Sequence, residues 1–277
     1  MSRDEVKTYY KGMGEREWLR LTSAEGEVEF EVTTRALKSF LRPGSAILDI
    51  GGGPGRYAIW LAGQGHTVTL ADLSGELLEI ARTKINEAGL TEKFSDIVEA
   101  DATDLSRWPD ASFNAVLSLG PFYHLPDASD REKAASEIVR VLKPGGLAFV
   151  AFMPVYTFLR RTLALPDERH HLTQPGWLNQ LLENGHFTNE VPGRFNQGFG
   201  VHPFDIFPFF QRFGLTGLNL LGTDGIAAGL QDTLLDLKTA DPTTYQAALD
   251  LVFQTAGDPS ILGMSGHLLY TGHKAES

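Results

Sequence analysis

The sequence predicts an α/β fold, a doubly wound and mostly parallel sheet of seven strands with a helical cap. Apolar runs alternate with helical patterns between residues 46 and 153, as they do when helices cover both faces of a parallel sheet. The first apolar run, residues 46–50, leads directly into glycines at positions 51, 53 and 55 and then into a helical pattern. Glycines at this spacing let the chain turn tightly out of a strand. They also let a ligand approach the main chain at the positive end of the next helix.

Local patterns place the individual elements of this core. Ser74 is expected to cap a helix with apolar positions at helical spacing, which ends near Gly89. The segment Lys-Pro-Gly-Gly at 143–146 is expected to stop a helix at 129–142 and to turn the chain into the next strand. Further helices are predicted at 56–64, at 203–213 and from about residue 242. The seven predicted strands are residues 46–50, 67–71, 96–100, 113–118, 147–152, 215–221 and 265–273.

The regular alternation of strands and helices fails after residue 153. Residues 154–202 are rich in Pro, Gly, His, Asn and aromatic residues, with only short helical pieces such as 176–183. Residues 1–41, in contrast, have helical patterns. We therefore expect a single domain in four parts: an N-terminal helical lid (1–41), a cofactor-binding core (42–153), a cap insertion over the substrate site (154–202) and the completion of the core sheet (203–277).

The composition argues against several classes of function. Of the 277 residues, 42% are apolar and 21% are charged, as in an ordinary globular protein. The net charge of −11 disfavours nucleic acid as the main partner, because that binding depends on Lys and Arg neutralising phosphates. The absence of cysteine excludes disulfides, thiolate metal sites and a cysteine nucleophile. The charged N-terminus and the lack of an apolar run of about 18 residues predict a cytoplasmic protein without a membrane span.

The glycine-rich loop distinguishes between two types of ligand. A dinucleotide fingerprint requires a third glycine three places after the second, but Arg56 stands there. The pattern Asp-x-Gly-x-Gly-x-Gly over residues 49–55 instead resembles the cofactor loop of class I S-adenosylmethionine (SAM)-dependent methyltransferases. Three further features follow in that family's order: Asp72 at the end of the second strand, Asp101 after the third, and Lys-Pro-Gly-Gly before the fifth. The segment Leu-Gly-Pro-Phe-Tyr-His-Leu at 119–125 is similar to the small-molecule branch of the family.

This resemblance, which covers roughly residues 44–153, implies a Rossmann-like sheet with an antiparallel last strand, SAM as cofactor and S-adenosylhomocysteine as product. Asp72 would accept hydrogen bonds from both ribose hydroxyls. Asp101, or Asp104 beside it, would accept from the adenine amino group, while the Ala102 amide donates to a ring nitrogen. Asp49 either organises the loop or meets the amino group of the ligand through water. The other implied cofactor contacts are Gly51, Gly52, Gly53 and Gly55 in the loop, Leu73 on the adenine face, Leu119 and Gly120 at the methionine end, and Tyr10 and Trp18 on an N-terminal helix that closes over the cofactor.

The catalytic residues are harder to infer, because an activated methyl donor leaves the enzyme mainly the work of alignment and water exclusion. His124 is the candidate general base, since imidazole exchanges protons near neutral pH, and the alternative is a histidine that shapes the pocket. Tyr123 either orients the acceptor or packs. His202 and Asp205 lack an evident third ligand, so we expect no metal and a capping role at the 203–213 helix.

The sequence therefore predicts a SAM-dependent methyltransferase that acts on oxygen, nitrogen or carbon of a small organic acceptor, without a nucleic-acid or membrane partner. The acceptor and the oligomeric state stay open. The alternative is a SAM-binding protein of the same fold without methyl transfer, either an enzyme similar to a decarboxylase or cyclase, or a non-catalytic binding module. A nicotinamide-dependent dehydrogenase is disfavoured by Arg56 in place of the third glycine.

Overall fold

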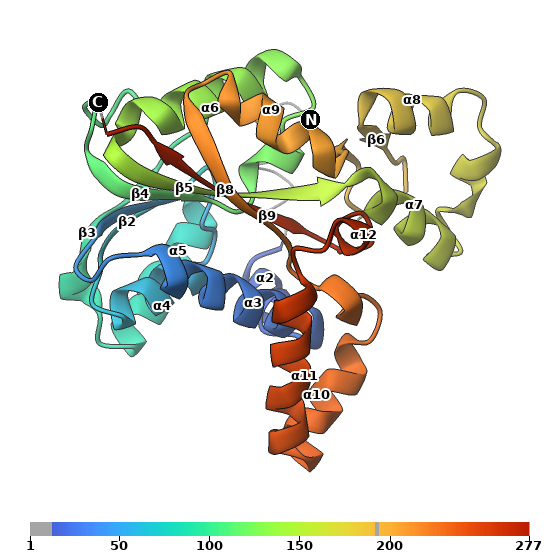
Figure 1. Ribbon diagram of the computed structural model, residues 1–277, viewed down its shortest axis with the longest axis horizontal. Helices are drawn as coiled ribbons and strands as arrows, with labels where there is room; N and C mark the ends of the chain where they lie inside the picture. The colour runs from blue at the N-terminus through green and yellow to red at the C-terminus, as the bar shows by residue number, and fades with distance from the viewer. Residues whose placement is uncertain (1–12, 192–193, 277) are drawn as a thin grey trace.

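The computed structural model describes residues 13–191 and 194–276 and has a nine-stranded sheet at its centre (Figure 1). Seven of the strands run in the order β3-β2-β1-β4-β5-β9-β8. Strands β1 to β5 are parallel, whereas β9 is antiparallel to both of its neighbours, β5 and β8. The doubly wound fold and the antiparallel last strand are therefore confirmed. The bounds are Ala46–Ile50 (β1), Thr67–Asp72 (β2), Phe94–Glu99 (β3), Phe113–Ser118 (β4), Leu142–Pro154 (β5), Leu215–Gly222 (β8) and Leu268–Lys274 (β9).

The sheet has two strands more than the sequence predicted. Strands β6 (His186–Thr188) and β7 (Gln197–Val201) form an antiparallel pair. Strand β7 also pairs in parallel with the end of β5, where Met153 faces Gly200 and Pro154 faces Val201. The predicted count of seven strands is thus wrong by this pair, because β6 has only three residues and β7 contains two glycines, which are typical of loops.

Helices cover both faces of the sheet, and its central strands are therefore buried on both sides. In β1, Ile47 packs on the face covered by α3 (Ala24–Phe40), α4 (Arg56–Gly63) and α5 (Gly75–Glu87). Its neighbour Leu48 packs on the opposite face, under α6 (Ala128–Val141) and α9 (Ile206–Gln211). The side chain of Ser74 caps α5 by accepting from the amide of Leu77, as the sequence predicted. Figure 1 shows α4 and α5 below the sheet and α6 and α9 above it.

The Lys-Pro-Gly-Gly segment is part of a strand rather than a separate turn. Helix α6 ends at Val141, close to the predicted stop, and β5 begins at Leu142. Gly145 has a φ of +70°, and the register with β4 shifts between Phe113 and Ala115. The predicted turn is therefore an irregular first part of β5. Gly145 allows this irregularity because glycine adopts a positive φ without strain.

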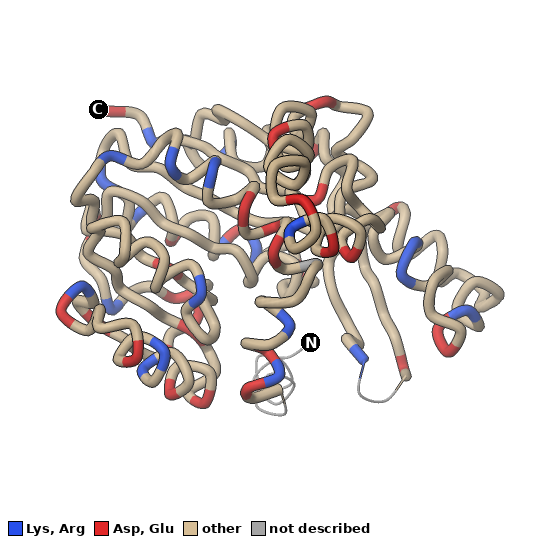
Figure 2. Tube along the Cα trace, turned by 90° about the horizontal axis from the view of Figure 1, so that it is seen from below, with Lys and Arg blue, Asp and Glu red and all other residues tan. Residues whose placement is uncertain are grey.

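The remaining helices lie around this core. Helices α2 (Glu15–Leu21) and α3 form the described N-terminal part, and α10 (Gln231–Ala240) and α11 (Pro242–Thr255) pack on α3 around Val28, Val32 and Tyr245. Helices α7 (Val155–Ala164) and α8 (Trp177–Asn184) belong to the 154–202 insertion and enclose a small core of their own around Phe158 and Phe187. A short helix, α12 (Pro259–Leu262), precedes β9. The division into lid, core, cap and completion stays a prediction. Figure 2 shows basic and acidic residues interspersed along the trace.

Candidate active site

A cavity of about 240 Å³ opens at the carboxyl ends of the parallel strands, where open α/β sheets bind their ligands. Segments that follow β1, β2, β3 and β4 meet there with residues from α2 and α3 and with the residue before β9. The cavity brings together twelve of the predicted site residues, which are Asp49, Gly51, Gly52, Gly53, Asp72, Leu73, Asp101, Ala102, Leu119, Gly120, Tyr123 and His124.

The glycine loop forms one wall of the cavity with bare backbone. Gly51 has a φ of +72°, and a Cβ there would lie 2.6 Å from the ring of Pro121. A Cβ on Gly52 would lie 2.6 Å from Oδ2 of Asp49. Larger residues at these two positions would therefore clash with the protein itself, so the loop requires glycine here. Gly55, also with a positive φ, is the residue before α4 and does not line the cavity.

Two buried carboxyl groups lie beside this loop. Asp72 accepts hydrogen bonds of 2.8 Å from the amides of Gly53 and Ser74, yet burial raises its pKa to about 6. Burial and the nearby carboxyl of Asp72 raise the pKa of Asp49 to about 7. Within the described residues, Oδ2 of Asp49 has no hydrogen-bond partner. Buried carboxyls of this kind are stabilised by a ligand that brings positive charge and hydroxyl donors. SAM brings both, so these residues fit the cofactor that the sequence implies.

The adenine end of the predicted site has its acid fixed by local hydrogen bonds. Oδ1 of Asp101 accepts from the amide and the hydroxyl of Thr103, both at 2.8 Å. Asp101 and Ala102 line the cavity, whereas Asp104 is exposed and does not. Asp101, the acid predicted from the sequence, therefore lines the cavity, and its alternative Asp104 does not.

The two predicted catalytic residues lie on a short 3-10 helix, η2 (Pro121–His124), after β4. The hydroxyl of Tyr123 donates to the carbonyl of Leu119 at 3.3 Å, and burial raises its pKa, so this group stays protonated. His124 is buried with its ring 5.1 Å from that of Phe195. Burial and the charge of Arg20 lower the pKa of His124 to about 3, so the imidazole is neutral at physiological pH. The role as a base stays a prediction, and this burial favours the reading in which His124 shapes the pocket.

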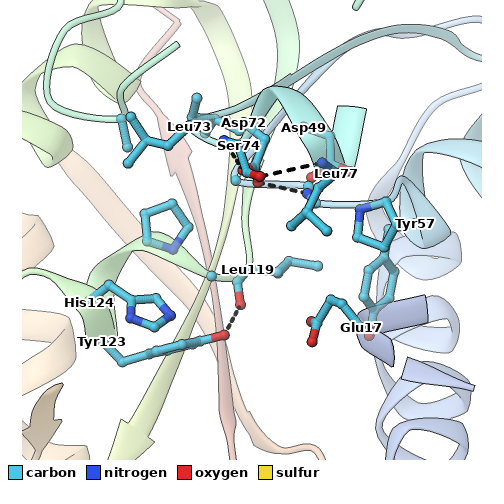
Figure 3. A pocket seen from close by; sticks show the side chains of 18 of the residues that line it. Glu17, Asp49, Tyr57, Asp72, Leu73, Ser74, Leu77, Leu119, Tyr123 and His124 are labelled. Carbon is cyan, nitrogen blue, oxygen red and sulfur yellow. Dashed lines mark hydrogen bonds between the residues drawn. The ribbon is translucent and has the colours of Figure 1, made fainter. Parts of the chain in front are cut away.

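The N-terminal helix contributes residues that the sequence analysis did not identify. Glu17, Arg20 and Leu21 of α2 line the cavity, and Glu17 is 4% exposed and paired with Arg20 at 2.7 Å. Figure 3 shows Glu17 across the cavity from Tyr123 and His124. The i, i+3, i+4 spacing of these three residues places them on one face of a helix, and this spacing could have identified them from the sequence. Trp18 does not line the cavity and lies with its ring 5.6 Å from Nζ of Lys84, and Tyr10 is outside the described residues.

Arg56 ties the glycine loop to the N-terminal helices. Its guanidinium donates to the carbonyls of Leu21 and Gly26, the latter at 2.8 Å, and pairs with Glu27 of α3 at 2.8 Å. Glu27 is also paired with Lys238 of α10. Burial opposes the ionisation of Glu27, but Lys238 and Arg56 together lower its pKa. The residue that replaces the third glycine thus connects three helices at the edge of the site.

The fold and the cavity at the strand ends fit the class I SAM-dependent methyltransferase domain that the sequence predicted. Residues 48–150 match the family model described as "Methyltransferase domain". The match covers the central part of the chain, and for this part it confirms the methyltransferase domain, the fold and the cofactor predicted from the sequence. Within the described residues, no helix is long and apolar enough to cross a membrane, and no cluster of three or more His, Asp or Glu is placed to hold a metal ion.

Two curated relatives match this central region. Methyltransferase GfsG of Streptomyces halstedii is 38% identical over 109 residues, which are 39% of this chain and 37% of the relative. Ubiquinone/menaquinone biosynthesis C-methyltransferase UbiE of Xanthomonas oryzae pv. oryzae is 35% identical over 140 residues, 46% of this chain and 51% of the relative. The chain thus spans between about a third and half of the length of the curated relatives it matches.

Solved structures show the same fold over most of the chain. A SAM-dependent methyltransferase from Methanosarcina mazei has a TM-score of 0.59 at 18% identity, covering 87% of this chain and 98% of that one. A protein from Pyrococcus horikoshii has a TM-score of 0.62 at 17% identity, with 92% and 93% covered. The [4+2]-cyclase SpnF has a TM-score of 0.54 at 19% identity, with 89% and 82% covered. At these identities the likeness establishes the fold alone.

Proposed function

We propose that this protein transfers a methyl group from SAM to oxygen, nitrogen or carbon of a small organic acceptor. The observation that carries the proposal is the pair of buried carboxyls, Asp49 and Asp72, beside a wall of bare glycine backbone. Neither carboxyl has a cationic side chain among the hydrogen-bond partners found in the described residues. A buried carboxylate without a cation is costly, and a cationic ligand removes that cost.

Each part of the site has a role in this proposal. SAM, when bound, supplies a methyl group already activated for transfer. Asp72 accepts hydrogen bonds from its ribose, Asp49 stabilises its positive charge, and the glycine loop lets it approach the main chain. The paired Glu17 and Arg20 of α2 close the cavity from the other side and help to exclude water. We extend the proposal to a cytoplasmic protein that acts on small molecules and has no nucleic-acid partner, as its net charge of −11 predicts.

Calorimetric titration with S-adenosylhomocysteine, run beside NAD, tests the cofactor assignment. We expect micromolar binding of S-adenosylhomocysteine and none of NAD. Asp72→Ala removes a charged hydrogen-bond acceptor and should weaken this binding at least about tenfold, since such bonds contribute about 1.5–3 kcal/mol each. The exposed Asp236 of α10 provides the matched control, and Asp236→Ala should bind like the parent. An affinity within twofold of the parent for Asp72→Ala would show that the cofactor assignment is wrong. Transfer of a labelled methyl group then separates the proposed activity from SAM binding without methyl transfer.

A further inference from the structure

The cavity contains a carboxylate–imidazole pair that the cofactor positions do not include. Glu29 of α3 and His267, the residue before β9, both line the cavity. Oε2 of Glu29 lies 3.5 Å from Nδ1 of His267, and each side chain is less than one-fifth exposed. The two residues are 238 positions apart in the chain, so their contact depends on the fold.

The backbone of His267 is held by hydrogen bonds, and its ring contacts Glu29 through one nitrogen. Its backbone carbonyl accepts from the amide and the hydroxyl of Thr223, at 3.0 and 3.3 Å. The ring lies 5.6 Å from the ring of Tyr123. Within residues 13–191 and 194–276, no hydrogen bond is found to Nε2 of His267. A carboxylate at one ring nitrogen orients an imidazole and stabilises the imidazolium that forms when the other nitrogen takes up a proton.

His267 is better suited than His124 to receive a proton in this cavity. His124 is buried, and burial together with the charge of Arg20 lowers its pKa to about 3, so its imidazole is a weak proton acceptor. The hydroxyl of Tyr123 already donates to the carbonyl of Leu119. This group can position the methyl acceptor, but it does not take a proton from it. His267 combines an adjacent carboxylate, that of Glu29, with a position in the lining of the cavity.

We propose that Glu29 and His267 form the proton-accepting pair of this site, and that the methyl acceptor is a phenol or an enol. This inference rests on the proposed function. An amine attacks through its lone pair and needs no base beforehand, whereas a hydroxyl acceptor must lose its proton. The acid dissociation constant of a phenol, with a pKa of about 10, is within about four powers of ten of that of an imidazolium, so an imidazole can take up its proton. The acid dissociation constant of a water-like hydroxyl is about nine powers of ten smaller than that of an imidazolium, so an imidazole is too weak a base for it.

The proposed step conserves atoms and charge. The hydroxyl proton of the acceptor moves to Nε2 of His267, while Glu29 stabilises the imidazolium. The electron pair of the acceptor oxygen, or of the ring carbon conjugated to it, forms a bond to the methyl carbon. The carbon–sulfur bond breaks, and its electron pair stays on sulfur as a thioether. Methylation at carbon also releases the ring proton to water, and the imidazolium returns its own proton to water.

Several charged or titratable groups face His267 and bear on the pH dependence. Glu29 lies on α3 and Tyr123 on η2. Asp224, which follows β8, accepts a hydrogen bond of 2.8 Å from the amide of Gly266, the residue before His267. Glu17 and Arg20, across the cavity on α2, form an ion pair with each other. Glu29 is therefore the carboxylate in direct contact with the imidazole.

The first test uses 4-nitrophenol, which absorbs visible light only when ionised. The S-adenosylhomocysteine-loaded protein is titrated with this probe about one pH unit below the pKa of the free phenol. We expect the parent to bind the probe as the phenolate, with an increase in visible absorbance, and His267→Gln to bind the neutral phenol. His170→Gln is the matched control, because His170 is exposed and outside the cavity. Absence of probe binding at millimolar concentration, or equal absorbance in the parent and His267→Gln, overturns the proposal.

The second test measures methyl transfer from labelled SAM to simple phenols, enols and amines. We expect transfer to phenols or enols, and a loss of about 10²–10⁴-fold in kcat for His267→Gln at neutral pH. At a pH where the acceptor ionises by itself, the rate of this variant should recover. Glu29→Gln, a second variant in case the first folds poorly, should lose activity with the same recovery. Methylation of amines alone, or His267→Gln within twofold of the parent at every pH, overturns the inference while leaving the proposed function intact. A failure of the parent to bind S-adenosylhomocysteine would instead refute the proposed function itself.

Discussion

Replacing the buried carboxyl of Asp49 by an amide should stabilise the ligand-free protein and weaken its binding of the cofactor. The pKa of Asp49 rises from its ordinary value of 3.8 to about 7 because of burial and the nearby Asp72. In the unfolded chain the carboxyl ionises near pH 4, whereas in the folded protein it keeps its proton until about pH 7. The folded state therefore loses stability as the pH rises through this range. At ~1.4 kcal/mol for each factor of ten, the full loss above pH 7 is about 4 kcal/mol.

An amide at this position is neutral at every pH and avoids that loss. Asp49→Asn should unfold with a free energy close to the parent's at about pH 4, and larger by about 1–4 kcal/mol at about pH 8. The binding of S-adenosylhomocysteine at about pH 8 should weaken at least tenfold, because the ligand then meets no ionised Asp49. Stability is measured by urea unfolding of the ligand-free proteins at both pH values, and affinity by calorimetry. Asp236→Asn, on the exposed surface of α10, is the matched control for both measurements.

Two results would refute this reasoning. A stability gain of the same size at both pH values would mean that packing, rather than the charge of Asp49, is responsible. An affinity within twofold of the parent would mean that the carboxylate has no part in holding the cofactor.

Two further substitutions test the walls of the cavity. Gly51→Ala should cost about 1–3 kcal/mol in the free energy of unfolding and weaken S-adenosylhomocysteine binding, because of its φ of +72° and the contact with Pro121. Gly63→Ala, in α4, is the matched control and should be neutral or slightly stabilising, because no atom lies within 4 Å of the added Cβ. Equal midpoints of urea unfolding for the two glycine variants would contradict this argument. Arg56→Ala should lower the free energy of unfolding by about 2–4 kcal/mol, because it leaves a half-buried Glu27 without this partner. Urea unfolding checks it against Arg42→Ala, an exposed arginine, and equal losses in both would show that the Arg56 contacts contribute nothing specific.

The core of the fold was predictable because its signals are local. Asp49, Asp72 and Asp101 each lie at or just after the end of an apolar strand, and the carboxyl ends of parallel strands meet at one edge of the sheet. Sequence patterns therefore place these residues together without any knowledge of tertiary contacts. The glycine loop is predictable for the same reason, since its backbone requirements are short-range.

The other half of the cavity was not predictable, because its residues come from distant segments with ordinary patterns. Glu17 and Glu29 look like exposed positions of amphipathic helices, and only the packing of α2 and α3 against the sheet brings them to the cavity. His267 precedes a strand at the other end of the chain. Strand β6 was missed because its three residues carry no periodicity, and β7 because its two glycines are typical of a loop.

The connection from Arg56 through Glu27 to Lys238 has a consequence for how the protein responds to its ligand. The glycine loop, α3 and α10 are joined by these ion pairs, although α10 does not line the cavity. A ligand that stabilises the loop should therefore slow local opening of α10, a helix that does not line the cavity. Amide hydrogen exchange would register the loading of the cofactor in α10, on the far side of the N-terminal helices.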